Sequence, residues 1–377
     1  MKNTVNWLKS FFAGLLTTLA VLGLLALTLG VLSILLTGGT PKTRTISGSN
    51  LGSVERFYLD ADNAIREAMP QVVTTEKKYR ITGDSEIPPY PNRDLYGQAE
   101  TPEQLGGVIA DAQKLLEGQA LYFSTVTDIY EKYGVKYYLD DTILAITWKK
   151  PINGSMYTFS EVKLADASQF RRYLTGGEYA SGKLLHATEM ASTVHAVVAS
   201  SGDYYGHRSA GTVVYNGSVC RVNNSIDTCY IDKNGDLLFS RIYEPMDQAS
   251  AEQFVADNDI RFSLAFGPIL VENGVPNNFG AYPLGEVADQ NARAAICQMD
   301  KLHYLLINAC DEDGHSLPTM YEFARRVAET GCVSAYALDG GQTTTLVMND
   351  QLVNRVVRNY QRKISDIIYF ATAIPNS

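Results

Sequence analysis

Two aspartates in this chain follow apolar runs and are flanked by glycine, a pattern that can support chemistry. In "SAYALDGGQTTTLV", Asp339 ends an apolar run and precedes Gly340 and Gly341. In "HAVVASSGDYYGHRSAG", Asp203 follows Gly202 after a second apolar run. Carboxyl groups at strand ends can transfer protons or act as nucleophiles in glycosyl transfer, and they can equally bind a divalent cation. A plain turn is the alternative for each loop.

The residues around the two aspartates favour a ligand with sugar and anionic groups. Glycines remove side chains that would block a ligand and let backbone amides face it. Tyr204 and Tyr205 offer aromatic rings for a sugar face, and Arg208 offers a guanidinium for phosphate or carboxylate. We expect folding to bring Asp203 and Asp339 together, so that both line one cleft open to solvent.

Strand patterns dominate the chain from residue 135 onward. Asn216-Gly217, between "TVVY" and "SVCRV", is a strong hairpin signal. Residues 166–174 ("DASQFRRYL") and 316–331 ("SLPTMYEFARRVAETG") have helical patterns, with Ser316 as the N-cap of the second. The sequence therefore predicts a strand-rich α+β domain of mixed or antiparallel sheet with a few helices.

The N-terminal region predicts a membrane anchor. No charged residue occurs from Ser10 to Pro41, and the run is long enough to span a bilayer as a helix. A cleaved signal peptide has a shorter apolar region, so we favour an uncleaved anchor. The predicted layout is a cytoplasmic tail (1–10), a transmembrane anchor (11–37), a linker (38–52), a helical and loop membrane-proximal region (53–134) and the strand-rich domain (135–377). The strand-rich domain is expected outside the cell.

Charge and cysteine usage exclude some classes of protein. The net charge of −9 argues against a nucleic-acid partner. The five cysteines include no CxxC pair, and no histidine pair has zinc-binding spacing, so no metal site is predicted. A disulfide between Cys220 and Cys229 is one interpretation, a Cys310–Cys332 disulfide is another, and buried free thiols are the third.

Five ordered segments resemble bacterial phosphodiester-glycosidase-like proteins, which are described as exopolysaccharide-biosynthesis proteins. This family is related to the lysosomal domain that removes N-acetylglucosamine from a phosphodiester. The resemblance covers about residues 135–373. Its segments are "HAVVASSGDYYGHRSAGTVVYNGSVCR", "FSLAFGPILVENG", "NARAAICQMDKLHYLLI", "ALDGGQTTTLVMN" and "RKISDIIYFA".

The resemblance implies a set of pocket residues. Asp203 and Asp339 would be catalytic, as acid, base or nucleophile. The substrate-binding residues would be Gly202, Tyr204, Tyr205, Arg208, Gly211, Arg293, Gly340, Gly341 and Thr344, with the two arginines holding the anionic group. The chain departs from the family pattern at Ser201, which replaces an asparagine, at Gln342, which replaces a glycine, and at Thr343, which replaces a serine.

The function implied is that of a membrane-anchored extracellular glycosidase. Its substrate would be a sugar phosphodiester or a cell-surface or exopolysaccharide glycan, and no cofactor is expected, although a divalent cation is compatible with the acids. The alternative is a non-catalytic glycan-binding factor in exopolysaccharide or envelope assembly, which would bind sugar in the same pocket without turnover.

Overall fold

The computed structural model describes residues 79–126, 129, 134–280, 282–283, 286–310 and 316–375. The tail, anchor and linker predicted for residues 1–52 lie outside these ranges. Within the described ranges, no helix is both long and apolar enough to cross a membrane. The predicted anchor therefore stays a prediction.

A nine-stranded antiparallel sheet is the largest in the described part of the chain, with the order β1-β2-β3-β4-β15-β14-β16-β12-β13. Its strands are β1 (Tyr96–Ala99), β2 (Val135–Leu139), β3 (Ile143–Ile152), β4 (Ser155–Leu164), β12 (Ile269–Glu272), β13 (Val275–Pro276), β14 (Arg293–Asp300), β15 (His303–Cys310) and β16 (Ser334–Leu338). All residues of β4 and β15 are buried, so both faces of the sheet are covered there.

Three smaller antiparallel sheets complete the strand content of the described residues. A five-stranded sheet has the order β18-β17-β6-β19-β5, a three-stranded sheet the order β10-β9-β11, and β7 pairs with β8. Their strands are β5 (Phe170–Leu174), β6 (Val198–Ser201), β7 (Val213–Tyr215), β8 (Ser218–Arg221), β9 (Thr228–Asp232), β10 (Leu237–Ser240), β11 (Ile260–Leu264), β17 (Leu346–Met348), β18 (Gln351–Leu352) and β19 (Asp366–Phe370).

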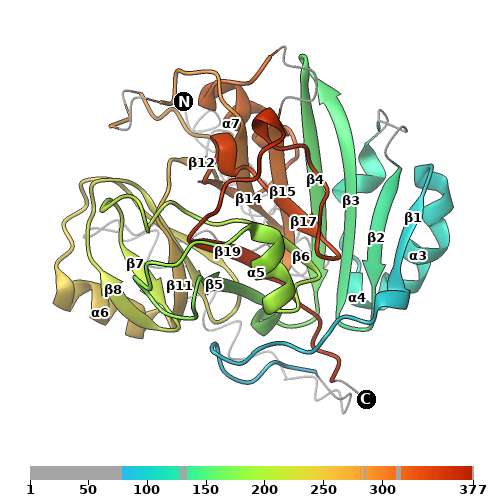
Figure 1. Ribbon diagram of the computed structural model, residues 1–377, viewed down its shortest axis with the longest axis horizontal. Coiled ribbons are helices and arrows are strands. Elements are labelled where there is room, and N and C mark those ends of the chain that lie inside the picture. Colours follow the sequence, from blue (N-terminus) through green and yellow to red (C-terminus); the bar gives the residue numbers. More distant parts are fainter. Residues whose placement is uncertain are drawn as a thin grey trace, which may run out of the picture. The chain divides into compact units, whose positions relative to one another are not determined.

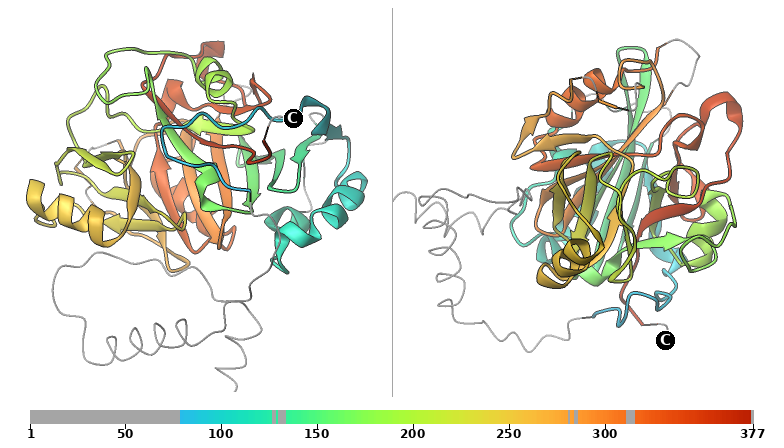
Figure 2. Two further views of the ribbon diagram at one scale, coloured as in Figure 1. Left: turned by 90° about the horizontal axis from the view of Figure 1, so that it is seen from below. Right: turned by 90° about the vertical axis from the view of Figure 1, so that its left-hand side faces the viewer.

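Helices are short and lie around the sheets. The α-helices are α3 (Gly106–Asp111), α4 (Gln113–Leu116), α5 (Ala187–Thr193), α6 (Gln248–Asp257) and α7 (Met320–Ala328). The 3-10 helices are η1 (Arg93–Leu95), η2 (Pro102–Leu105), η3 (Tyr122–Thr125), η5 (Ala167–Gln169), η6 (Gly341–Thr343) and η7 (Val357–Asn359). The segment with β1 and α3 and the helix α6 lie at opposite sides of the described region (Figures 1 and 2). These elements give the strand-rich α+β fold that the sequence predicts.

The two faces of the nine-stranded sheet belong to different apolar cores. Phe159 and Ile307 pack on one face with Phe323 of α7. On the other face, Leu306 and Tyr336 pack against the five-stranded and three-stranded sheets. A third core lies between the five-stranded sheet and α5, which covers β6 and β19 (Figure 1). The alternation of side chains along each strand produces this layering.

Several local patterns predict the structure correctly. Asn216 and Gly217 adopt φ values of 49° and 75° and join β7 to β8, as a two-residue hairpin turn requires. The predicted helix at 316–331 is α7, but its N-cap is Thr319, which accepts a hydrogen bond from Glu322 N. The N-cap predicted at Ser316 is therefore wrong, since the helix begins after Pro318.

The helix predicted for residues 166–174 is wrong. Only η5 is helical there, and residues from Phe170 onward form β5, which pairs with β19. The strand places Phe170 and Arg172 on one face, where Phe170 joins the core beneath the five-stranded sheet. Pairing with β19 overrides the local helical pattern.

All five cysteines are free thiols. Cys220 lies on β8 and Cys229 on β9, which belong to different sheets, so the two cysteines do not flank one hairpin. The predicted disulfides are therefore not formed. Cys229, Cys310 and Cys332 are buried and behave as small apolar residues.

Candidate active site

The two predicted aspartate loops lie side by side. Asp203 follows β6, and Asp339 follows β16. The backbone amide of Asp339 donates a 2.9 Å hydrogen bond to the carbonyl of Gly202. The hydroxyl of Ser201 donates a 3.0 Å hydrogen bond to the carbonyl of Asp339. The serine that departs from the family pattern thus joins the two loops directly.

Asp203 is shielded from solvent rather than open to a cleft. It is 1% exposed, and its carboxylate accepts hydrogen bonds of 2.7 Å from the amides of Tyr205 and Ala265. Arg172 Nη2 lies 2.8 Å from its Oδ2. Asp339 is buried as well, at 6% exposed, so the expectation that both aspartates line a cleft open to solvent is wrong. The surroundings of Asp203 are polar donors that satisfy the buried carboxylate.

Arg172 and Asp366 complete this network. Arg172 Nε and Nη2 lie 3.0 Å and 2.9 Å from Asp366 Oδ2, and both side chains are fully buried. Asp366 Oδ2 also accepts a 3.1 Å hydrogen bond from the amide of Asp203. A Cβ on Gly202 would lie 1.9 Å from Asp366 Oδ2, so only glycine fits at this position. We call Asp203, Asp339 and Asp366 the carboxylate cluster.

Local sequence patterns give neither Asp366 nor Arg172 a role in the site. Asp366 is the acid of "RKISDIIYFA", one of the segments that carry the family resemblance. Arg172 lies in "DASQFRRYL". The helical pattern of this segment does not predict that the Arg172 side chain is buried on a strand. An acid and an arginine at buried strand positions are the signal that could have identified them, because buried charges need partners.

Asp339 has the environment of a proton-transferring acid. Its pKa is raised from 3.8 to about 8, first by burial and then by the charges of Asp366 and Asp203. A hydrogen bond with Thr343 and the charge of Arg362 act in the opposite direction. The protonated form of Asp339 therefore predominates at neutral pH, which is unusual for a carboxyl group.

Asp366 shares this electrostatic environment. Burial raises its pKa to about 7, the charge of Arg172 opposes that rise, and the charge of Asp203 adds to it.

An aromatic residue and a cation lie at the outer side of Asp339. Tyr204 is half-buried, and its ring stacks on His207 at 4.8 Å between centroids. Arg362 Nη2 donates a 3.2 Å hydrogen bond to the Tyr204 hydroxyl, and its guanidinium lies 5.6 Å from the ring centroid. Gly340 and Gln342, which follow Asp339 in the chain, are also half-buried. This outer side is the accessible part of the site.

The two predicted anion-binding arginines bind backbone carbonyls in this structure. Arg208 Nη2 donates to the carbonyl of Phe266 at 2.8 Å, and its guanidinium lies 4.9 Å from the Phe266 ring centroid. Arg293 Nη2 donates to the carbonyls of Glu286 and Asp289 at 2.9 Å and 2.5 Å. Burial lowers the pKa of Arg293 to about 10. Both side chains hold loops in place.

Tyr205 and Thr344 lie inside the protein rather than on a wall of an open pocket. Tyr205 is 6% exposed and stacks on Tyr179 at 5.4 Å, with the Arg172 guanidinium 5.4 Å from its ring centroid. Thr344 is fully buried, and its carbonyl accepts a 2.9 Å hydrogen bond from Asn354 Nδ2.

The remaining predicted glycines have steric reasons for their identity. A Cβ on Gly340 would lie 2.5 Å from the carbonyl oxygen of Ala292. Gly341 has a φ of 62° and donates a 2.7 Å hydrogen bond to the same carbonyl. At Gly211, with a φ of 81°, a Cβ would lie 2.4 Å from that of Ala265. The glycines allow tight packing around the carboxylate cluster.

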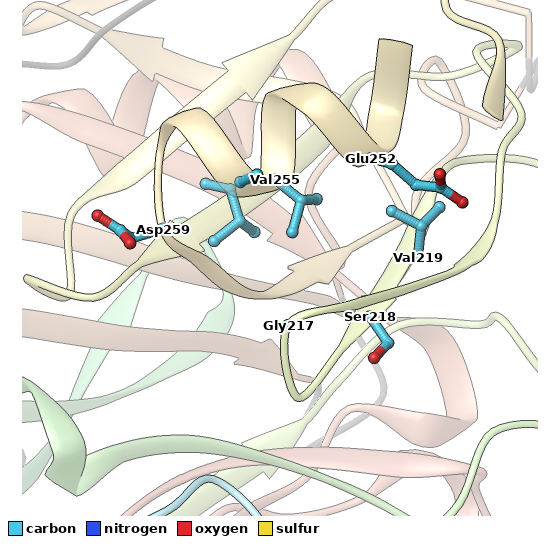
Figure 3. Close-up of a pocket in the computed structure, with 8 residues that line it drawn as sticks. Gly217, Ser218, Val219, Glu252, Val255 and Asp259 are labelled. Carbon is cyan, nitrogen blue, oxygen red and sulfur yellow. The ribbon is translucent and has the colours of Figure 1, made fainter. Parts of the chain in front are cut away.

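A hollow on the surface lies away from the carboxylate cluster. Within the ranges that the structure describes, no three His, Cys, Asp or Glu side chains are grouped so as to hold a metal ion. A hollow of about 430 Å³ lies between the β7–β8 turn and α6 (Figure 3). Gly217, Glu252 and Asp259 are among its lining residues, and the carboxylate cluster contributes none.

The structure is a strand-rich α+β fold with the buried carboxylate cluster at adjoining strand ends. Residues 193–371 match the NAGPA family model, described as phosphodiester glycosidase. This part of the chain is thus a domain of the phosphodiester glycosidase family. The match begins later than the residue 135 at which the predicted domain starts. A search of curated proteins gives no match.

Solved structures show a distant likeness. The zebrafish N-acetylglucosamine-1-phosphodiester alpha-N-acetylglucosaminidase catalytic domain, auto-inhibited by its pro-peptide, is 17% identical with a TM-score of 0.47, covering 63% of this chain and 81% of that chain. A hypothetical protein from Synechocystis is 14% identical with a TM-score of 0.43, covering 62% and 63%. At this level of similarity, the family assignment depends on the match over residues 193–371.

Proposed function

We propose that this protein hydrolyses the bond between a sugar and a phosphodiester, with Asp339 as the proton donor. The observation that carries the proposal is the raised pKa of Asp339, about 8, at the end of a strand beside an accessible cation and aromatic ring. A carboxylic acid that stays protonated at neutral pH can donate a proton to a leaving oxygen. The family of residues 193–371 supports this reaction class.

The proposed reaction follows from the placement of these groups. The bond between the anomeric carbon and the phosphate oxygen breaks as the Asp339 proton passes to that oxygen. Water supplies the new hydroxyl on the anomeric carbon, and a water proton restores the acid. Arg362 faces the phosphate charge, and Tyr204 carries the hydroxyl that bonds to Arg362.

Asp203 and Asp366 have a supporting role in this proposal. Arg172 contacts both carboxylates. Burial is the largest cause of the raised pKa of Asp339, and the charges of Asp366 and Asp203 raise it further. A direct role of Asp203 as nucleophile or base stays a prediction. Arg208 and Arg293 keep the surrounding loops in place through carbonyl contacts.

The location proposed for this activity is the outer face of the cell membrane. The charge-free run from Ser10 to Pro41 supports an anchor at residues 11–37. The substrate would then be a sugar phosphodiester or a glycan of the cell surface.

Substitution of Asp339 tests the proposal. The full-length chain is incubated with a sugar 1-phosphodiester, and release of free sugar is measured. Asp339→Asn is expected to lower the rate at least about a hundredfold, because the amide cannot donate an acidic proton. Its melting temperature should stay close to that of the unmodified protein, since asparagine resembles the neutral acid in shape.

The matched control is Asp257→Asn on the exposed face of α6, which makes the same chemical change away from the carboxylate cluster. Arg362→Gln should raise KM for the phosphodiester. Equal turnover by the Asp339→Asn variant would end the assignment. Saturable sugar binding without product would favour the glycan-binding alternative.

A further inference from the structure

The segment of residues 353–365, here the basic loop, has a charge opposite to that of the whole chain. It contains Arg355, Arg358, Arg362 and Lys363 and no acidic residue, whereas the chain has a net charge of −9. Such a local reversal indicates a surface that attracts anions, because the summed field of several cations extends over the Debye length of about 8 Å in physiological salt.

Buried residues hold the basic loop in one conformation. Val353 and Val356 are 7% and 6% exposed and point inward. Asn354 accepts a 2.7 Å hydrogen bond from Leu346 N and donates one of 2.9 Å to the carbonyl of Thr344. At the other end, Ile364 pairs with Leu185 through two backbone hydrogen bonds. The loop is therefore a fixed platform rather than a loose tail.

Three of the four cations of the basic loop are exposed. Arg355, Arg358 and Lys363 are exposed, and so is Tyr360, at 61%. Within the described part of the chain, no carboxylate forms an ion pair with any of the loop's cations. Lys363 lies near enough to Glu189 of α5 for their charges to interact.

The basic loop adjoins the proposed active site. The 3-10 helix η7 within the loop contacts η6, which directly follows Gly340. Arg362 belongs to the loop, bonds to Tyr204 and acts on the charge of Asp339. Arg358 lies in η7 and Arg355 lies two residues before it, so both exposed cations belong to the segment that contacts η6.

We propose that the basic loop binds the continuation of a polyanionic glycan whose reacting phosphodiester lies at Asp339. The inference rests on the proposed function and specifies its substrate class as a polymer with repeated anionic groups. A single small diester needs at most the cation at Arg362. Exposed cations further along the loop, with Tyr360 as an aromatic surface for a sugar ring, fit neighbouring units of a chain.

Charge removal on the loop tests this inference with defined probes. Binding of the full-length chain to phosphomannan and to neutral mannan is measured at several salt concentrations, and hydrolysis is measured on a small sugar 1-phosphodiester. The variant is Arg355→Gln/Arg358→Gln. The control is Lys301→Gln/Arg325→Gln, which removes the same charge from the β14–β15 turn and from α7, outside the loop.

The variant is expected to bind phosphomannan roughly tenfold more weakly, with a shallower salt dependence. The control should bind like the unmodified protein, mannan should not bind, and kcat/KM for the small diester should be unchanged in both. Equal phosphomannan binding by variant and control would overturn the inference. Two other outcomes would also overturn it. One is loop-dependent binding to phosphatidylglycerol vesicles without binding to phosphomannan. The other is a loss of small-diester turnover in the variant that is as large as its loss of phosphomannan binding.

Failure of the proposed function gives a different result. In that case the unmodified protein would release no sugar from the small diester, whereas phosphomannan binding and its dependence on Arg355 and Arg358 would still be measurable.

Discussion

Arg172 Nη2 lies 2.8 Å from Oδ2 of Asp203, and both side chains are completely shielded from solvent. The ion pair joins β5 to the loop after β6, and Arg172 also contacts Asp366 on β19. A single guanidinium thus contacts both acids and reduces the repulsion between them inside the protein. Asp339, which has no such partner, keeps its proton to a higher pH.

Loss of the Arg172 guanidinium should destabilise the fold strongly. Arg172→Met leaves two buried carboxylates without a cation, and the free energy of unfolding at neutral pH is expected to fall by about 3–5 kcal/mol. Urea denaturation measures this change. The loss should be smaller in acid, where protonation removes the charge of Asp366.

A surface pair provides the control for Arg172. Arg326 pairs with Glu329 at 2.8 Å, and the Glu329 side chain is 52% exposed. Arg326→Met should cost at most about 1 kcal/mol because solvent screens the pair. Similar losses in the two variants would contradict a buried ion pair at Arg172.

The rate of hydrolysis should fall as pH rises through about 8. Asp339 has a pKa of about 8 and must be protonated to donate, so the active fraction decreases about tenfold per pH unit above that value. A pH profile of kcat/KM on a sugar 1-phosphodiester measures this. A rate that instead increases through the same range would assign Asp339 as a base rather than an acid.

The stability of the folded state should decrease between about pH 4 and pH 8. The pKa values of Asp339 and Asp366 are raised to about 8 and about 7 in the folded state, against 3.8 for an ordinary aspartate. The folded protein therefore binds more protons than the unfolded chain in this range. Their stabilising contribution is complete below about pH 4 and is lost as pH rises through the folded values.

Urea denaturation at several pH values tests this linkage. Each acid contributes a slope of at most about 1.4 kcal/mol per pH unit. Asp339→Asn, which has no titrating proton, should flatten the decline, and Asp257→Asn should leave it unchanged. A wild-type stability that rises from about pH 5 to pH 8 would show that the acids are ionised when folded.

Gly202 should tolerate no side chain. A Cβ at this position would lie 1.9 Å from Asp366 Oδ2, inside the charged network, so Gly202→Ala is expected to cost about 1–3 kcal/mol or more. Thermal unfolding measures the loss. In contrast, a Cβ on Gly107 in α3 meets nothing within 4 Å, and Gly107→Ala should stabilise by up to about 1 kcal/mol. Equal melting temperatures in the two variants would refute the predicted clash.

Local patterns identify a part of the site from the sequence. Asp339 lies at the end of an apolar run that is β16, and Gly202-Asp203 follows the run that contains β6. Asn216-Gly217 predicts its hairpin because two consecutive positive φ values suit few other residue pairs. These features depend on neighbours in the chain, and the sequence displays them directly.

Other parts of the site depend on partners that are distant in the sequence. Residues 166–174 look helical, yet Arg172 lies on a strand because β5 pairs with β19, near the C-terminus. Asp203 looks like an exposed turn residue, yet it is buried because Arg172 and the amide of Ala265 satisfy its carboxylate. Neither partner is visible in the local pattern.

The sequence by itself determines the strand-rich character, the apolar N-terminal run and the two glycine-flanked aspartates, since composition and short-range spacing encode them. Tertiary structure alone decides that the pKa of Asp339 is raised. Asp203 and Asp339 have similar local sequences, but only Asp203 receives the Arg172 guanidinium, and burial then raises the pKa of Asp339. The physical reason is that the charge state of a buried acid depends on the groups that surround it in space.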